Sequence, residues 1–125
     1  MKRSPLSRRT PLARSGPVKP KNAKRRKREF ERAYGGASRV EWIKTLPCVV
    51  ASPLCQGPIE NMHVRGGGVA RKADARFIAP ACHGHHAQLH LVGKTVFEKM
   101  HRVNLDVAAS VVEDMWQRKL ARENP

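Results

Sequence analysis

The sequence has few of the residues that build a large core or cross a membrane. Only six of its 125 residues are aromatic, and no apolar run approaches the roughly 18 residues that span a bilayer. No apolar stretch of the kind found in a signal peptide follows the basic N-terminus. The three cysteines cannot pair without a remainder, which disfavours a secreted disulfide protein. We therefore expect one small intracellular domain whose modest core needs a metal.

Acidic residues are absent from the first 28 positions, which hold twelve of the 25 lysines and arginines and four prolines. Such a segment has little to bury and is expected to be disordered when free. The formal net charge of +15 points to a polyanionic partner, nucleic acid before an anionic membrane surface. We expect residues 1–28 to be a basic arm that holds DNA by phosphate contacts, the alternative being a solubilising tail, and residues 29–125 to fold.

Local patterns predict an α+β fold built from short elements. Ser38 and Glu41 fit a capping box at the start of a helix that Pro47 would stop. In the C-terminal helix, Val107, Val111, Met115 and Leu120 fall near helical spacing, with Ala108 and Trp116 beside them. This amphipathic helix would pack on the core or on a second copy, and the oligomeric state stays open. Strands are predicted near 59–64 and 77–80, and helices at 22–34, from 38, from 85 to Gly93, around 97–101 and at 106–122.

Residues that can bind metal are concentrated between positions 48 and 90, which contain all three cysteines and five of the six histidines. One tetrahedral zinc takes four Cys or His ligands, generally offered as two close pairs. Cys48 with Cys55, and Cys82 with His85, provide two such pairs. The sequence therefore predicts a structural zinc site, the alternative being that the cysteines are small buried hydrophobic residues.

The remaining histidines suggest a second, catalytic metal. His86 and His90 are four positions apart, so on a helix they share one face and can bind one ion. If the strand that holds His63 packs on this helix, a neutral imidazole could deprotonate water while the ion stabilises charge on a phosphate. The alternatives are two surface histidines and a hydrogen-bonded core histidine. His83 and His101 have no predicted role.

The stretch of residues 48–105 resembles the HNH (ββα-metal) endonuclease superfamily, and most closely the RecA-dependent nucleases of phages and prophages that enhance recombination. The resemblance implies a small zinc-stabilised ββα-metal core with flanking helices, acting on DNA in the bacterial cytoplasm with a RecA filament as partner. The matching segments are LPCVV (46–50), IENMHVRGGG (59–68), KAD (72–74), ACHGHHAQLH (81–90) and HRVNL (101–105), with MKRSPLSRRTPL at the start.

The resemblance also implies roles for single residues. His63 would be the general base, and Asp74 would brace the loop or approach the catalytic ion. His86 and His90 would bind that ion, which could be Mg, Mn or Zn, and Arg65 would contact phosphate. Similar sequences carry a carboxylate between the two helical histidines, where this chain has Ala87-Gln88-Leu89. The arm's basic run would also bind DNA without strong sequence preference: Lys24, Arg25, Arg26, Lys27 and Arg28.

A rival from another class explains the charge and the zinc site equally well. It is a non-catalytic, zinc-stabilised DNA-binding or recombination-accessory module. It does not explain the spare pair His86 and His90, and the number of bound metals would distinguish the two hypotheses.

Overall fold

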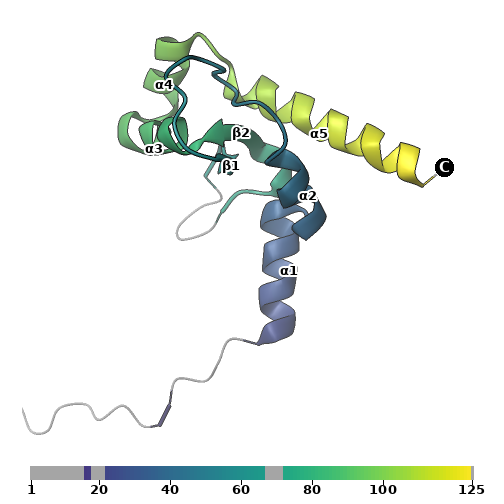
Figure 1. The fold of residues 1–125 in the computed structure, drawn as a ribbon. Coiled ribbons are helices and arrows are strands. Elements are labelled where there is room, and N and C mark those ends of the chain that lie inside the picture. Colours follow the sequence, from purple (N-terminus) through teal and green to yellow (C-terminus); the bar gives the residue numbers. More distant parts are fainter. Residues whose placement is uncertain (1–15, 18–21, 67–71, 125) are drawn as a thin grey trace, which may run out of the picture.

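The computed structural model describes residues 16–17, 22–66 and 72–124, and its mixed α+β architecture confirms the predicted class (Figure 1). In the described part of the chain, no helix is long and apolar enough to cross a membrane. The elements in chain order are α1 (Ala23–Tyr34), α2 (Ala37–Ile43), β1 (Ile59–His63), the 3-10 turn η1 (Ala75–Phe77), β2 (Ile78–Cys82), α3 (His83–Val92), α4 (Lys94–His101) and α5 (Leu105–Glu123).

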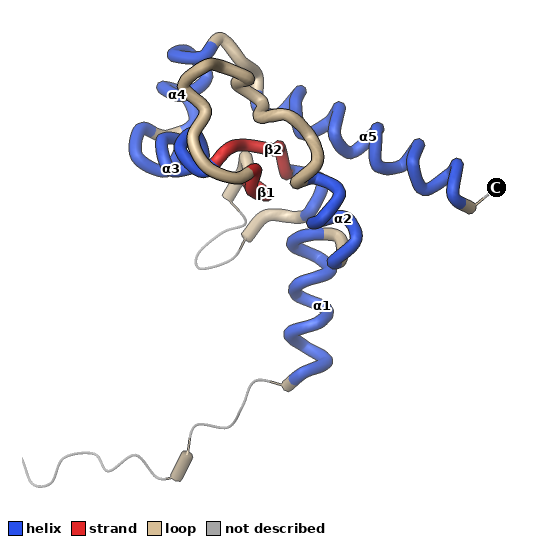
Figure 2. Tube along the Cα trace, viewed as in Figure 1, coloured by secondary structure: helices blue, strands red, loops and turns tan. Residues whose placement is uncertain are grey.

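The centre of the fold is the antiparallel hairpin of β1 and β2, which is followed directly by α3 (Figure 2). Its register pairs Ile59 with Cys82 and His63 with Ile78. Successive side chains of a strand point to opposite faces. Met62 therefore faces the core under α4 and α5, whereas Asn61 faces α2 and donates a hydrogen bond from Nδ2 to the Val40 carbonyl over 3.2 Å.

The α1 helix begins inside the segment that the sequence assigns to a disordered arm. The side chain of Asn22 accepts a hydrogen bond from the Lys24 amide over 3.0 Å and caps the helix. The helix ends at Gly35, whose φ of +78° is a conformation that favours glycine. The helix predicted at 22–34 is therefore confirmed, and its first turns overlap the last six residues of the segment 1–28 that the sequence assigns to the arm. Residues 1–15 and 18–21 lie outside the described residues.

The α2 helix corrects one expectation. It begins at Ala37, and its N-cap position, Gly36, has no side chain to bond the first turn. Ser38 consequently lies within the helix, and the predicted capping box does not form. The helix instead follows directly from the glycine pair that ends α1.

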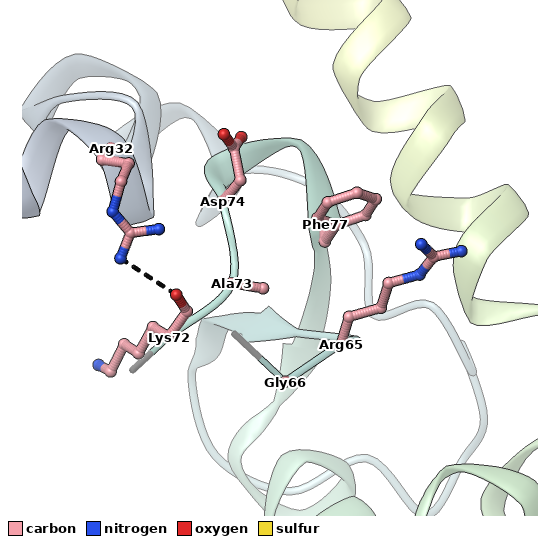
Figure 3. Close-up of a pocket in the computed structure, with 7 residues that line it drawn as sticks. All are labelled: Arg32, Arg65, Gly66, Lys72, Ala73, Asp74 and Phe77. Atoms are coloured by element: carbon pink, nitrogen blue, oxygen red, sulfur yellow. Dashed lines mark hydrogen bonds between the residues drawn. The ribbon is translucent and has the colours of Figure 1, made fainter. Parts of the chain in front are cut away.

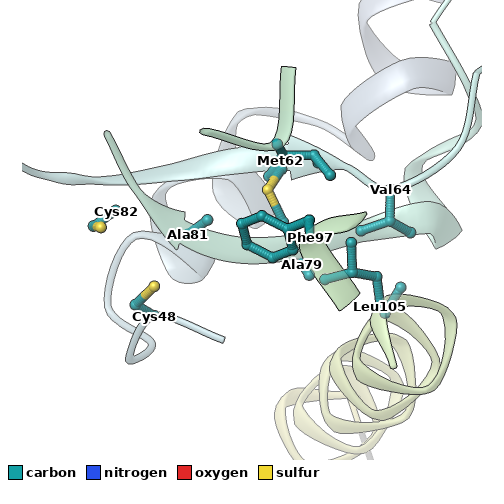
Figure 4. Packing of buried hydrophobic residues seen from close by; sticks show 10 residues of the cluster. Cys48, Met62, Val64, Ala79, Ala81, Cys82, Phe97 and Leu105 are labelled. Carbon is teal, nitrogen blue, oxygen red and sulfur yellow. The ribbon is translucent and has the colours of Figure 1, made fainter. Parts of the chain in front are cut away.

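The main core lies between the hairpin and the C-terminal helices (Figure 4). The Phe97 ring of α4 is fully buried beside Met62 and Leu105. The buried face of α5 carries Leu105, Ala109, Val112 and Trp116. The residues that the sequence placed on one apolar side are exposed instead: Val107 at 57%, Val111 at 53% and Met115 at 43%.

The helix α5 therefore packs on the core, as one of the two alternatives has it, through the stripe that includes Trp116 and not through Val107, Val111 and Met115. Both stripes of α5 have helical spacing, so periodicity alone could not choose between them. The small side chain of Ala109 marks the face that approaches the hairpin closely, because it is 1% exposed within the main core cluster. A second, smaller cluster joins Ile43 and Ile78 to Val112.

A buried arginine ties α2 to η1 and α5. Arg39 is only 2% exposed, and its guanidinium donates to the Ala75 carbonyl over 2.8 Å and to the Glu113 carboxylate over 2.7 Å. A Cβ atom at Gly35 would lie 2.5 Å from Cδ of Arg39, so this stem packs against bare backbone. Burial lowers the pKa of Arg39, although Glu113 and Asp74 oppose the effect.

Candidate metal centre and active site

Three cysteines and one histidine meet where β2 passes into α3. Cys48 and Cys55 come from the loop before β1, Cys82 ends β2, and His85 lies in the first turn of α3. Their ligand atoms all lie within 4.8 Å of one another. His85 Nδ1 is 3.5 Å from the Cys48 sulfur, 3.6 Å from that of Cys55 and 3.1 Å from that of Cys82.

These separations fit one tetrahedral zinc ion. Bonds of about 2.3 Å to sulfur and about 2.0–2.1 Å to nitrogen place such ligand atoms roughly 3.5 Å apart. The cluster can therefore hold a structural metal ion such as zinc, on the four residues that the sequence predicted. No other set of three or more His, Cys or carboxylate ligands converges in this way within residues 22–66 and 72–124.

Backbone contacts hold the cysteine loop against the start of α3. The Gly84 amide donates to the Gln56 carbonyl over 3.0 Å, and the His83 amide donates to the Pro58 carbonyl over 2.9 Å. Gly57 makes this approach possible, because a Cβ atom there would lie 2.7 Å from Cβ of His83. The loop is thus positioned by its own hydrogen bonds as well as by its cysteines.

The electrostatics of His85 and Cys82 suit metal binding, since a coordinating imidazole must be neutral and a coordinating cysteine must be a thiolate. Burial lowers the pKa of His85, and the nearby charge of His101 lowers it further. Burial opposes ionisation of Cys82, but hydrogen bonds from the backbone of His85 and Gln56 and from the other two thiols outweigh it and lower its pKa. Burial instead raises the pKa of Cys55, so this thiol would lose its proton only as the metal binds.

A second histidine group lies on the exposed side of α3. The Nε2 atoms of His86 and His90 face each other at 3.1 Å. Two imidazoles that bind one zinc-sized ion at about 2.0–2.1 Å place their nitrogens roughly 3.3 Å apart. The pair therefore has the spacing of two ligands to one ion, as the sequence predicted from their positions four residues apart.

Glu60 of β1 lies beside this histidine pair, a contact that the sequence did not predict. Its carboxylate lies 3.0 Å from Nδ1 of His86 and 3.2 Å from Nδ1 of His83. A carboxylate can only accept, so Nδ1 of His86 carries the proton, and Nε2 keeps the lone pair that a metal would need, which here faces Nε2 of His90. Burial opposes ionisation of Glu60, but the two histidines outweigh it and lower its pKa. Strand alternation with Met62 was the signal that could have placed Glu60 facing α3.

His63 lies at the end of β1 and contacts α1. Its Nε2 donates to the Ala33 carbonyl over 2.6 Å, and its ring meets the Tyr34 ring edge-on at 5.1 Å. Because a carbonyl can only accept, the neutral ring carries its proton on Nε2 and keeps a lone pair on Nδ1. Burial lowers the pKa of His63, with help from Lys72 and Arg32, while backbone contacts oppose it.

The structure brings His86 and His90 together and leaves His63 apart from them. Glu60 and His63 are an odd number of positions apart in β1, so their side chains point to opposite faces of the hairpin. Glu60 joins His86 on the α3 side, and His63 joins Ala33 on the α1 side. The strand packs on the helix as expected, but His63 and the helical pair occupy different sides of the hairpin.

Asp74 and Arg65, two further residues of the predicted site, both have partners within the fold. Asp74 caps η1, where its carboxylate accepts from the Arg76 amide over 2.9 Å, so it braces the loop. These contacts, through the backbone amide first, lower the pKa of Asp74. Arg65 pairs with Asp106 over 2.9 Å and lies 4.8 Å from the centre of the Phe77 ring. The basic residues at 24–28 are exposed along α1.

The chain finds no match among protein-family models, curated proteins or solved structures. Its interpretation therefore depends on its own residues. Their contacts define a zinc-type cluster, a facing histidine pair oriented by a carboxylate, and a half-buried histidine bonded to the Ala33 carbonyl.

Proposed function

We propose that this chain is a metal-dependent endonuclease of the HNH (ββα-metal) type, which hydrolyses phosphodiester bonds of DNA. The observation that carries the proposal is the facing pair of His86 and His90, held in one tautomeric state by Glu60. If the domain needed a metal only in order to fold, the Cys₃His cluster alone would be sufficient. A second pair at ligand spacing, on the same hairpin–helix unit, favours a second ion with a chemical task.

The proposed chemistry of the chain's own residues centres on His63. Its Nδ1 lone pair takes a proton from water as the water oxygen bonds to phosphorus and one P–O ester bond breaks; the leaving oxygen takes a proton from solvent. The Ala33 carbonyl, bonded at Nε2, stabilises the imidazolium that forms. A divalent ion (Mg, Mn or Zn) at His86 and His90 would supply charge stabilisation on the phosphate. Because that pair lies on the α3 side of the hairpin and His63 on the α1 side, the proposed mechanism requires the phosphate to lie at the edge of the hairpin, within reach of both sides.

The proposed substrate is DNA, bound with little sequence preference. The cations of the arm and the exposed basic residues of α1 favour phosphate contacts over contacts to base edges. A RecA filament as partner, a phage or prophage origin and a place in the bacterial cytoplasm are proposed on the resemblance of the motifs alone.

The test is nicking of supercoiled plasmid by the purified protein with Mg, Mn and Zn in turn, on bare DNA and on DNA carrying RecA filaments. His63→Ala and His90→Ala should each abolish metal-dependent nicking while zinc stays bound. Met115→Ala shortens an exposed side chain on α5 and serves as the control. Since His63 and His90 lie on different sides of the hairpin, each variant tests its own role. Intact nicking by His63→Ala would overturn the assigned base.

A second candidate is the non-catalytic, zinc-stabilised DNA-binding or recombination-accessory module. It is favoured by the absence of a further group of three or more metal ligands in the described ranges. Metal analysis separates the two. One tightly held zinc per chain favours this module, and a second, exchangeable ion that His90→Ala removes favours the nuclease.

A further inference from the structure

A pocket of about 310 Å³ opens between the end of α1, the end of β1 and the segment that leads into η1 (Figure 3). Its size is at the lower end of small-molecule pockets, which span about 300–1,000 Å³. Gly66 and Lys72, which both line the pocket, form an isolated antiparallel bridge. The pocket is lined by Arg32, Arg65, Gly66, Lys72, Ala73, Asp74 and Phe77.

Three cations line this pocket against one carboxylate. Asp74 is held by Arg76, whose Nε lies 3.3 Å from its carboxylate, so its charge is largely compensated. Lys72 has no acidic partner within the part of the chain that the structure describes; its Nζ lies 4.7 Å from the centre of the Tyr34 ring and bonds to the Tyr34 hydroxyl. The lining therefore presents net positive charge.

Arg32 and Lys72 are each held in place by a contact across the pocket wall, Lys72 by Tyr34 and Arg32 by backbone. Arg32 donates from its guanidinium to the Lys72 carbonyl over 3.1 Å, which links α1 to the far wall of the pocket (Figure 3). Its ion pair with Glu29 is longer, at 3.3 Å, and half-exposed, so that pair contributes little. The same two cations lie close enough to His63 to act on its charge.

We propose that this pocket binds a phosphodiester group of the nucleic-acid backbone, with Arg32 and Lys72 as its principal ligands and Arg65 at its outer edge. Planar guanidinium groups and lysine ammonium groups are the usual protein ligands of phosphate. The inference rests on the proposed function, because it assigns the place where the substrate strand passes His63. Arg65 stands further out because its guanidinium already pairs with Asp106.

The test is a residue-resolved NMR titration of the isotope-labelled full chain with thymidylyl-thymidine, the simplest phosphodiester dinucleotide. The amides of Gly66 and Ala73 should shift on binding. The double variant Arg32→Gln/Lys72→Gln should bind about tenfold more weakly at these amides, the scale expected for lost charge-assisted hydrogen bonds. Arg118→Gln removes one cation from an exposed ion pair on α5 and should leave the affinity unchanged. The single variant Lys72→Gln is measured as well, so that the test still holds if the double variant does not fold.

Each other outcome overturns the assignment. Unshifted Gly66 and Ala73 amides, or equal affinity in the folded Lys72→Gln and parent proteins, would exclude the pocket. Binding of inorganic phosphate but not of the dinucleotide would make it a site for free phosphate. Plasmid nicking by the parent protein keeps the two proposals apart: nicking without pocket shifts refutes only the pocket, and pocket shifts without nicking under any metal refute only the hydrolysis.

Discussion

The buried guanidinium of Arg39 provides the sharpest test of how the fold is held together. We predict that Arg39→Met destabilises the zinc-loaded protein by about 3 kcal/mol. The Ala75 carbonyl would lose a 2.8 Å hydrogen bond, which for a buried acceptor costs about 1–3 kcal/mol. Glu113 would lose its cationic contact at 2.7 Å, but its side chain is 25% exposed and can hydrate, so the full cost of a broken buried pair does not apply.

The assay is urea and thermal unfolding, each followed by circular dichroism at saturating zinc. For a domain of this size, about 3 kcal/mol corresponds to a fall of roughly 12–24 °C in Tm. Lys44→Met is the matched control, because Lys44 makes an exposed ion pair with Glu41 at 2.9 Å, and its loss should cost less than about 1 kcal/mol.

A double-mutant cycle with Glu113→Gln isolates the pair itself. The coupling between Arg39 and Glu113 should fall in the range of about 0.5–3 kcal/mol that contacting residues show. If Arg39→Met cost no more than Lys44→Met, the hydrogen bonds of Arg39 would not stabilise the junction of α2, η1 and α5, and the reasoning would fail.

Three further predictions concern the metal, the base and the arm. Cys82→Ala or zinc chelation should unfold the hairpin and α3, because structural zinc binding of about 10–16 kcal/mol matches the net stability of a small domain; cooperative melting without zinc would contradict this. A general base works when deprotonated, so the lowered pKa of His63 should put the acid limb of nicking below about pH 6.5. Lys72→Gln should move that limb upward, and NMR titration of His63 checks both shifts. Deleting residues 1–21, with their seven cations, should reduce the salt slope of DNA binding by at most about 6; an unchanged slope would leave the arm a solubilising tail.

The zinc-type cluster could be predicted from sequence because its information is local and chemical. A structural zinc needs thiolates and imidazoles in close pairs, and Cys82 and His85 are three positions apart at the start of a helix. The spacing of His86 and His90 is local in the same sense. The hairpin and the later helices were also predictable, since each has its own apolar pattern and its own glycine or capping residue.

The rest of the site depends on contacts between distant segments. Glu60 reaches His86 across 26 positions, and Arg39 reaches Glu113 across 74. Neither contact produces a periodic pattern in the sequence, because it needs only one polar residue at each of two distant positions. The buried face of α5 could not be chosen either, since both apolar stripes repeat with helical spacing. The place of His63 depended on which side of β1 faces α1, and this is set by tertiary packing.

A truncation that removes residues 1–28 is unsuitable for testing the arm, because residue 28 lies within the helix α1. Its first turns expose the basic residues that the sequence assigned to the arm, and its last turn contacts the candidate site. The Ala33 carbonyl bonds to His63, and Arg32 bonds to the Lys72 carbonyl. A truncation at 28 would remove the Asn22 cap and the first turns of this helix, and so would weaken the contacts that fix the tautomer of His63. Loss of activity in that truncated chain could then come from the base rather than from DNA binding. Ending the deletion at residue 21 keeps the Asn22 cap and all of α1 while it removes seven cations.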